Sequence, residues 1–326
     1  MRAAGVADVL VRIVERRRER LAGEGHGEGL VEALAGGERA AATAGPGAAS
    51  ARVPGAAALA SDAVGSVDVP LTATTNRFLA ALAAAPEPAV IAEIKMGSPR
   101  LGSLAGRFDP EEVARSYAAA GAAALSVVVE PDFFGGSYEL LARCRAASGL
   151  PALAKDFVVH PVQLERARAA GADAVLLIAA LYDRAELTAL AGRARRLGLA
   201  PLIETHATAD LDLLAGAGWE LVGINHRDLR TFEVDLDRSA ALLPRLPAGA
   251  LKVAESGIAS AADVARLAAA GFDAFLVGES LVLAPDPAAK LRALRGEGPP
   301  PLAGSRTSSP APRGPARSPA AEPAEP

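Results

Sequence analysis

Glu93 and Lys95 stand two residues apart in AVIAEIK (89–95), a stretch that is otherwise apolar. In a β-strand this spacing places both side chains on one face. A lysine in a dry pocket can act as a general acid or bind an anion, and a glutamate can balance its charge or act as a base. Lys155 in PALAKDF and Glu204 in APLIE end two further apolar runs. Four such groups around one pocket would be typical of acid–base catalysis, whereas one Lys–Glu pair is often only a salt bridge.

A second group of residues is small and could bind an anion. Ser256 and Gly257 follow the apolar run LKVAE, and Gly278 ends the run DAFLVG. Small residues at such positions let backbone N–H groups face an anion, with help from the N-termini of the helices that follow. These residues predict a phosphate group in the substrate, although turn residues alone would explain the same glycines.

The elements that must position these groups are short apolar runs that alternate with helical patterns. The runs are almost continuously apolar, which is typical of parallel strands covered by helices. The predicted strands span 89–95, 123–130, 151–157, 173–179, 200–204, 221–225, 251–256 and 273–278. The helical stretches between them include 110–121, 160–171, 184–198 and 260–271.

A weak internal repeat supports this order of elements. A helix that ends in Ala-Gly and is followed by a strand occurs near residues 120, 170, 215 and 270. The recurrence at roughly fifty residues equals two βα units. Eight such units over about 200 residues predict an α/β fold, the (β/α)8 TIM barrel. The rival is a doubly wound open sheet, which would need a glycine-rich phosphate loop after the first strand, and no GxGxxG stands there.

Composition limits the remaining possibilities. The 326 residues are 51% hydrophobic, which is enough for one large core, and the formal charge of −4 gives no sign of a nucleic-acid partner. The run Arg16–Arg18 lies between two glutamates and is predicted to be a solvated helix face. No segment is a clear membrane span or a signal peptide. The single Cys144 excludes an intramolecular disulfide and fits a reducing compartment, so we expect a cytoplasmic protein.

The predicted domain organisation has three parts, which differ in composition. The first is an N-terminal helical extension with an amphipathic helix, an Ala/Gly-rich linker and a second helix stopped by prolines. The second is the barrel, and the third is a disordered Pro/Ala-rich tail. The predicted bounds are 1–87 for the extension, with its linker at about 22–72, then 88–295 for the barrel and 296–326 for the tail.

Taken together, the motifs resemble the indole-3-glycerol-phosphate synthase family of tryptophan biosynthesis. The similar pieces, in the family's order, are VIAEIK-x-x-SP, ALSVVVE-x-x-FFGGSYELL, PALAKDF, GADAVLLI, LIETH, LVGINHRDLRTFEVDL, ESGI and DAFLVGESL. The resemblance covers most of residues 6–295 and is weakest across 22–70. It implies a carboxy-lyase that converts 1-(2-carboxyphenylamino)-1-deoxyribulose 5-phosphate to indole-3-glycerol phosphate by ring closure, loss of CO₂ and loss of water, without a metal or an organic cofactor.

The resemblance also implies roles for individual residues. Lys155 would be the general acid on the ketone oxygen, Lys95 would bind the substrate carboxylate, and Glu204 would stabilise positive charge or act as a base. Glu93 and Asn225 would orient these groups. Phe134 would pack on the aromatic ring of the substrate, and Arg227 would lie near its anthranilate part. The remaining substrate and phosphate contacts would come from Ser98, Ser256, Gly257 and Gly278. The expected partner is a small phosphorylated substrate, and the expected state is a monomer or a weak homo-oligomer.

The loop after the first strand departs from this family. The family usually reads K-R-x-S-P-S-K-G here, whereas this chain has Met96 after the lysine and Arg100-Leu101 after the proline.

Two alternatives to this family stay open. One is a related phosphate-binding barrel such as phosphoribosylanthranilate isomerase or the tryptophan synthase α subunit, although the isomerase would need a catalytic cysteine and Cys144 falls in a predicted helix. The other is a non-catalytic paralogue, against which the intact acid–base residues argue.

Overall fold

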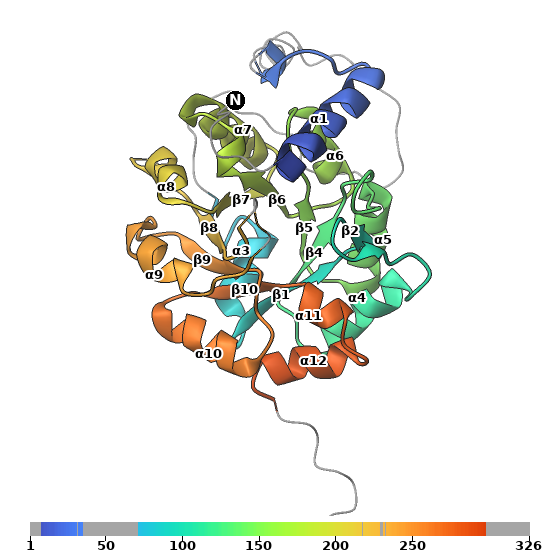
Figure 1. Ribbon diagram of the computed structural model, residues 1–326, viewed down its shortest axis with the longest axis vertical. Helices are drawn as coiled ribbons and strands as arrows, with labels where there is room; N and C mark the ends of the chain where they lie inside the picture. The colour runs from blue at the N-terminus through green and yellow to red at the C-terminus, as the bar shows by residue number, and fades with distance from the viewer. Residues whose placement is uncertain are drawn as a thin grey trace, which may run out of the picture.

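The computed structural model describes residues 8–30, 32–34, 71–216, 218–228, 231 and 233–297. Most of the predicted linker, residues 35–70, and the predicted tail from residue 298 onward lie outside the described residues. The described chain forms a ring of parallel strands enclosed by helices (Figure 1). Among the described residues, no helix is long and apolar enough to cross a membrane.

Eight parallel strands close into a barrel, which confirms the predicted (β/α)8 fold. Neighbours in sequence are neighbours in the barrel, and β1 closes the ring by pairing with both β4 and β10. The strands are β1 (Ala89–Ile94), β4 (Ala124–Val128), β5 (Ala152–Lys155), β6 (Ala174–Ile178), β7 (Ala200–Thr205), β8 (Leu221–Asn225), β9 (Leu251–Glu255) and β10 (Ala274–Val277). Nearly every strand residue is buried, as expected for strands covered on both faces.

The helices surround the barrel and alternate with the strands (Figure 1). They are α4 (Pro110–Ala119), α5 (Tyr138–Ser148), α6 (Val162–Ala169), α7 (Arg184–Arg196), α8 (Thr208–Leu214), α9 (Arg238–Leu242), α10 (Ala261–Ala270), α11 (Glu279–Val282) and α12 (Pro287–Leu294). Short 3-10 turns, Ala179–Leu181 and Leu243–Arg245, follow β6 and α9. Cys144 is fully buried in α5, and its Sγ lies 3.6 Å from the backbone oxygen of Pro110 at the start of α4, so it packs between these two helices.

The helix boundaries follow from local chemistry. The side chains of Asp109, Ser137, Asp183, Ser260 and Asp286 accept backbone N–H groups at the first turns of their helices. The Ala-Gly repeat marks the other ends, because the glycines near residues 120, 170, 215 and 270 all have positive φ. The left-handed conformation there turns each chain end back toward the next strand, as the repeat predicted.

One pair of short strands was not predicted. β2 (Gly97–Ser98) and β3 (Gly102–Ser103) form an antiparallel hairpin directly after β1, where the sequence indicated only a loop. Two-residue strands carry no hydrophobic periodicity, so their pairing leaves no pattern to read. The hairpin places residues 99–101 at a tip beside the C-terminal end of the barrel.

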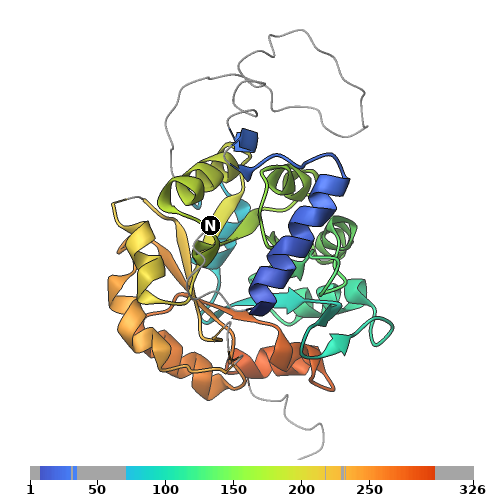
Figure 2. The same ribbon diagram turned by 45° about the horizontal axis from the view of Figure 1, so that its top comes forward.

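The N-terminal extension meets the barrel at both ends. α3 (Arg77–Ala84) begins at Asn76, whose amide Nδ2 donates to the backbone oxygens of Asp173 and Gly198 at the N-terminal side of the barrel. α1 (Asp8–Gly23) lies instead beside the C-terminal mouth, where it contributes Val9 and other apolar residues to the cavity wall (Figure 2). The amphipathic helix of the extension, α1, thus lies against the barrel.

Candidate active site

A cavity of about 650 Å³ opens at the C-terminal ends of the strands, the face where barrel enzymes carry their active sites. Its size lies within the usual range for small-molecule sites. All eleven residues predicted to be catalytic or to bind substrate line this one cavity: Glu93, Lys95, Ser98, Phe134, Lys155, Glu204, Asn225, Arg227, Ser256, Gly257 and Gly278. The chain therefore brings together, from seven strand ends and their loops, all the groups whose chemistry the sequence suggested.

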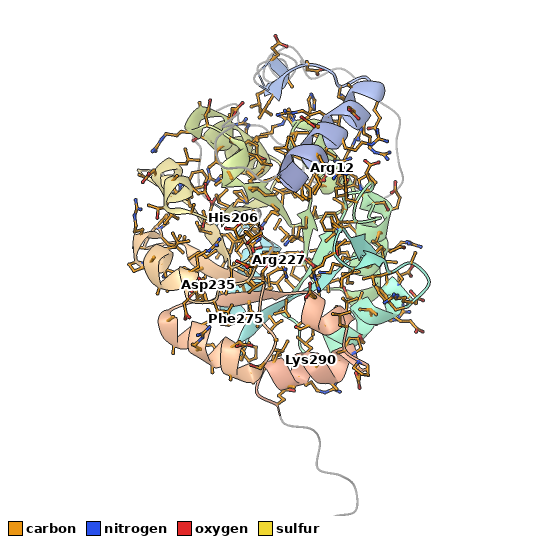
Figure 3. The ribbon with its side chains drawn as sticks, in the orientation of Figure 1. Arg12, His206, Arg227, Asp235, Phe275 and Lys290 are labelled. Atoms are coloured by element: carbon orange, nitrogen blue, oxygen red, sulfur yellow. The ribbon has the colours of Figure 1, made fainter. Side chains whose placement is uncertain are left out.

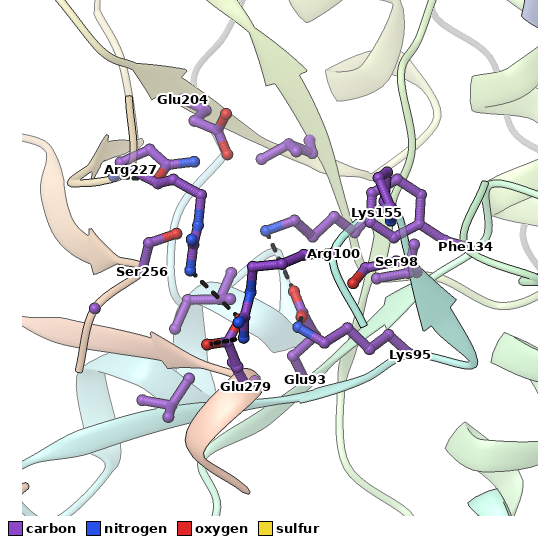
Figure 4. A pocket seen from close by; sticks show the side chains of 18 of the residues that line it. Glu93, Lys95, Ser98, Arg100, Phe134, Lys155, Glu204, Arg227, Ser256 and Glu279 are labelled. Carbon is purple, nitrogen blue, oxygen red and sulfur yellow. Dashed lines mark hydrogen bonds and ion pairs between the residues drawn. The ribbon is translucent and has the colours of Figure 1, made fainter. Parts of the chain in front are cut away.

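The centre of the site is a buried carboxylate held between two lysines (Figure 4). Glu93 Oε1 lies 3.0 Å from Lys95 Nζ, and Glu93 Oε2 lies 3.3 Å from Lys155 Nζ. Burial alone would raise the pKa of Glu93, but the two ammonium groups outweigh it and lower the pKa to about 2. Glu93 is therefore ionised at neutral pH, and its two oxygens fix the positions of both ammonium groups.

Lys155 is surrounded by carboxylates. Burial alone would lower its pKa, but three nearby carboxylates, that of Glu93 foremost, raise the pKa above its ordinary value. The ammonium therefore stays protonated across the neutral range, which is the state that a proton donor needs. Its aliphatic stem comes from the last residue of β5, so the charged end reaches over the middle of the barrel (Figure 4).

Glu255 belongs to the same cluster, although the predicted site omitted it. It ends β9, is fully buried, and its Oε2 lies 3.6 Å from Lys155 Nζ. Burial first, and the neighbouring Glu204 second, raise its pKa well above the ordinary value. Glu255 is thus the carboxyl of the cluster best suited to hold a proton. The signal that could have found it is its place at a strand end, next to the small residues of ESGI.

A glycine on the adjacent strand makes room for this carboxyl group. A Cβ on Gly223 in β8 would lie 2.0 Å from Glu255 Oε1, so no larger residue fits there without moving Glu255. Glycine inside a strand commonly marks such a close approach.

Glu204 ends its run beside a histidine, as the sequence order LIETH predicts. His206 Nε2 lies 3.2 Å from Glu204 Oε1, and both side chains are buried at the mouth. Figure 3 shows His206 beside the ends of β7 and β8, Arg227 nearer the middle of the barrel and Arg12 on α1. Asn225 acts locally, because its Oδ1 accepts the backbone N–H of Arg227 at 3.0 Å and so orients the loop after β8.

The two residues directly after β9 have backbone conformations that residues other than glycine rarely adopt. Ser256 has φ of 66° and Gly257 has φ of 79°, both in the left-handed region that favours glycine. A non-glycine residue in that region is often found at functional sites. A Cβ on Gly257 would also lie 2.2 Å from Val234 Cγ1, so this turn requires glycine for space as well as for conformation.

Gly278 has a further role that the sequence did not indicate. A Cβ at this position would lie 2.3 Å from Glu93 Oε1, so the missing side chain makes room for the central carboxylate. The short helical turn predicted after it is α11. The helix after Gly257, α10, begins as predicted at Ser260, which uses its own side chain to cap the helix.

The opposite wall of the cavity is apolar. Phe134 and Phe157 lie with their ring centroids 6.0 Å apart, which is a favourable distance for two aromatic rings. Val9, Leu10 and Ile13 of α1 extend the same wall. A flat aromatic group fits such a surface, and the N-terminal extension is part of it.

The contact that holds α1 on the barrel corrects the prediction that the run Arg16–Arg18 is a solvated face. Arg17, from the run predicted to be a solvated face, is 2% exposed, and its guanidinium donates to Asp156 Oδ2 at 2.6 Å. Tyr138 and Gln163 donate to the same carboxylate. Only the flanking arginines of the run face outward, and Arg20 one turn on pairs with Asp132. The prediction was wrong for Arg17 because Asp156, its partner, lies far along the chain in the residue after Lys155.

One cluster away from the cavity has metal-ligand chemistry. Potential ligand atoms of His26, Glu28 and His160 lie within 4.8 Å of one another. However, the backbone N–H of Val162 donates to His160 Nδ1, so a neutral ring carries its proton on Nε2, the nitrogen 3.4 Å from Glu28. A metal at Nε2 would need that proton on Nδ1, facing the Val162 N–H. The geometry therefore favours a His160–Glu28 contact over a metal site.

Comparison with known proteins identifies the family of this chain. A family profile described as "Indole-3-glycerol phosphate synthase" matches residues 56–294. The chain belongs to the indole-3-glycerol phosphate synthase family. Curated relatives with that name include a protein of Azoarcus sp. (strain BH72), 51% identical over 64% of this chain and 80% of its own length, and one of Albidiferax ferrireducens, 48% identical over 68% and 84%.

Among solved structures, a 3-hexulose-6-phosphate synthase matches with a TM-score of 0.50 and 16% identity, covering 65% of this chain and 100% of the other. At that identity the likeness shows the barrel fold alone. Membership of the indole-3-glycerol phosphate synthase family favours the synthase over the related phosphate-binding barrels considered from the sequence.

Proposed function

We propose that this chain converts 1-(2-carboxyphenylamino)-1-deoxyribulose 5-phosphate to indole-3-glycerol phosphate with Lys155 as the proton donor. The observation that carries the proposal is the position of the Lys155 ammonium, between Glu93 at 3.3 Å and Glu255 at 3.6 Å in the cavity floor. Ring closure requires an arene carbon to attack a ketone, and protonation of the ketone oxygen stabilises the charge that develops there. The carboxylates around Lys155 keep that proton available at neutral pH.

The other charged groups divide the remaining steps. Lys95, on the far side of Glu93, binds the substrate carboxylate, and its attraction falls away as CO₂ leaves. Glu204 faces the positive charge that develops on the substrate nitrogen. Glu255 has a raised pKa, partly because of Glu204, so these two carboxyl groups together accept and return the proton moved during dehydration.

The walls of the cavity orient the substrate. The backbone N–H groups around Gly257 and Gly278, with the Ser256 loop, bind the phosphate, since these small residues line the cavity at the ends of neighbouring strands. Phe134 packs on the aromatic ring at the apolar wall, and Ser98 and Arg227 face the substrate from the loops after β1 and β8. Asn225 holds the second of these loops in place.

The direct test is turnover. Purified protein incubated with the carboxyphenylamino-deoxyribulose phosphate should produce the fluorescence of indole-3-glycerol phosphate. Well-folded protein without turnover would contradict the proposal, and turnover by a Lys155→Ala variant at the wild-type rate would contradict the assignment of the acid.

The cellular context is also proposed. A single, fully buried cysteine fits a reducing compartment, which supports a cytoplasmic enzyme. The site is assembled within one chain, so a monomer or a weak homo-oligomer suffices for activity. Light scattering at assay concentration measures the state, and activity lost strictly on dilution to monomer would contradict this expectation.

A further inference from the structure

The β2–β3 hairpin is internally ordered and lies at the rim of the cavity. The Leu101 N–H donates to Ser98 Oγ at 3.0 Å across the tip, and the Leu104 N–H donates to the backbone oxygen of Met96 at 2.8 Å at the base. These bonds shape the hairpin, but they do not connect its tip to the other side of the barrel mouth.

That connection is made by Arg100, one of the residues at which this loop departs from its family. Arg100 Nε donates to Glu279 Oε2 at 3.2 Å, and Arg100 Nη2 forms an ion pair with Glu279 Oε1. The contact is therefore a two-point guanidinium–carboxylate pair, a geometry that adds directional preference to charge attraction. It joins the hairpin after β1 to the first residue of α11 after β10 (Figure 4).

Glu279 stands in an unusual place for a carboxylate. It directly follows Gly278, in the corner proposed to bind the substrate phosphate, and both residues line the cavity. Burial tends to raise the pKa of Glu279, but Arg100 and then Arg227, 3.5 Å from Oε2, lower it, so the group is charged at neutral pH. A charged carboxylate left without its cations there would repel a phosphate.

We propose that Arg100 is a positioning residue with two effects through Glu279: it holds the hairpin closed over the cavity and it offsets the negative charge beside the phosphate corner. The second effect rests on the proposed phosphate site, and the first does not. The pair explains how this chain tolerates a glutamate at the phosphate corner together with an altered loop.

Two charge-removing variants separate these effects, and neither readout depends on turnover. In Arg100→Gln and in Glu279→Gln, hydrogen exchange of the hairpin amides, residues 97–104, should be about three- to tenfold faster than in the wild type, because both lack the pair. Arg107→Gln is the matched control, since it removes an exposed arginine from the same loop. If hydrogen exchange of the hairpin amides is unchanged in both variants, the Arg100–Glu279 pair does not hold the hairpin closed and the first effect is overturned.

Binding of inorganic phosphate, measured by titration calorimetry, tests the second effect. Arg100→Gln should weaken phosphate binding about three- to tenfold, because Glu279 is left less compensated. Glu279→Gln should bind phosphate at least as well as the wild type, and Arg100→Gln/Glu279→Gln should return to within about twofold of it. A merely structural role would weaken binding in all three variants.

The remaining outcomes are also decisive. If the double variant binds phosphate as weakly as Arg100→Gln, Arg100 contacts the phosphate directly and the charge-offset role is overturned. If wild-type protein binds no phosphate, the charge-offset role falls together with the proposed phosphate site, whereas the exchange result still decides whether Arg100 and Glu279 hold the hairpin closed.

Discussion

Replacing Glu93 with glutamine should lower the pH at which the Lys155 ammonium loses its proton. The wild-type carboxylate lies 3.3 Å from the ammonium, and burial by itself would lower the Lys155 pKa. A unit charge at that distance contributes about 5 kcal/mol at an effective dielectric constant of about 20, which corresponds to about 3 to 4 pKa units as an upper bound. Because Glu204 also raises the Lys155 pKa and is left in place, we expect a fall of about 2 to 3 units.

The assay is the pH dependence of kcat in the fluorescence-based turnover measurement. In the wild type, the Lys155 pKa lies above its ordinary value of 10.5, so activity that needs the protonated ammonium should show no alkaline loss from this group through pH 10. In Glu93→Gln the alkaline loss of rate, about tenfold per pH unit, should begin about 2 to 3 pH units lower than in the wild type, because the charged form of Lys155 has lost its main partner.

The matched control is Glu111→Gln, which removes a carboxylate from the outer helix α4, where Glu111 pairs with Arg143. It should leave the pH profile unchanged. A Glu93→Gln profile as flat as that of the wild type would refute the reasoning, because it would mean that Glu93 does not hold the proton on Lys155.

Two further substitutions test packing. Gly278→Ala should lower kcat at least about tenfold with the fold retained, because the new Cβ would lie 2.3 Å from Glu93 Oε1. The control Gly249→Ala, with no atom within 4 Å of the new Cβ, should leave kcat unchanged. Equal activities of the two variants would contradict the steric account. Arg17→Met should lower the free energy of unfolding by about 3 kcal/mol in urea denaturation, because it leaves a buried carboxylate without its cation. Arg12→Met on the exposed face of α1 should change it by less than about 0.5 kcal/mol, and similar losses in both would exclude a special role for the buried pair.

Much of the site could be predicted because the barrel itself brings strand ends together. Once eight βα units were recognised, residues as distant in sequence as Glu93 and Glu204 had to share one face. Glu255 was omitted from the predicted site because its burial and its closeness to Lys155 depend on two tertiary features. One is the register of β8 and β9, in which Asn225 pairs with Glu255, and the other is the space that Gly223 leaves for its carboxyl group.

The errors came from features that no local pattern records. The pattern of charges along α1 contains no information about Asp156, which lies 139 residues beyond Arg17 and turns an apparently solvated arginine into a buried one. The ion pair between Arg100 and Glu279 joins residues that are 179 positions apart, and the hairpin that carries Arg100 is too short to show a strand pattern. Contacts of this kind are set by tertiary packing, which the local sequence cannot specify.

The central claim, that Lys155 donates the proton in ring closure, is tested most directly by comparing wild-type and Lys155→Met protein in the turnover assay. Methionine keeps much of the aliphatic stem and removes the ammonium. The account predicts that the wild type forms indole-3-glycerol phosphate and that the variant, folded by circular dichroism, is at least about 100-fold slower in kcat. A folded variant that turns over within a few-fold of the wild-type rate would contradict it.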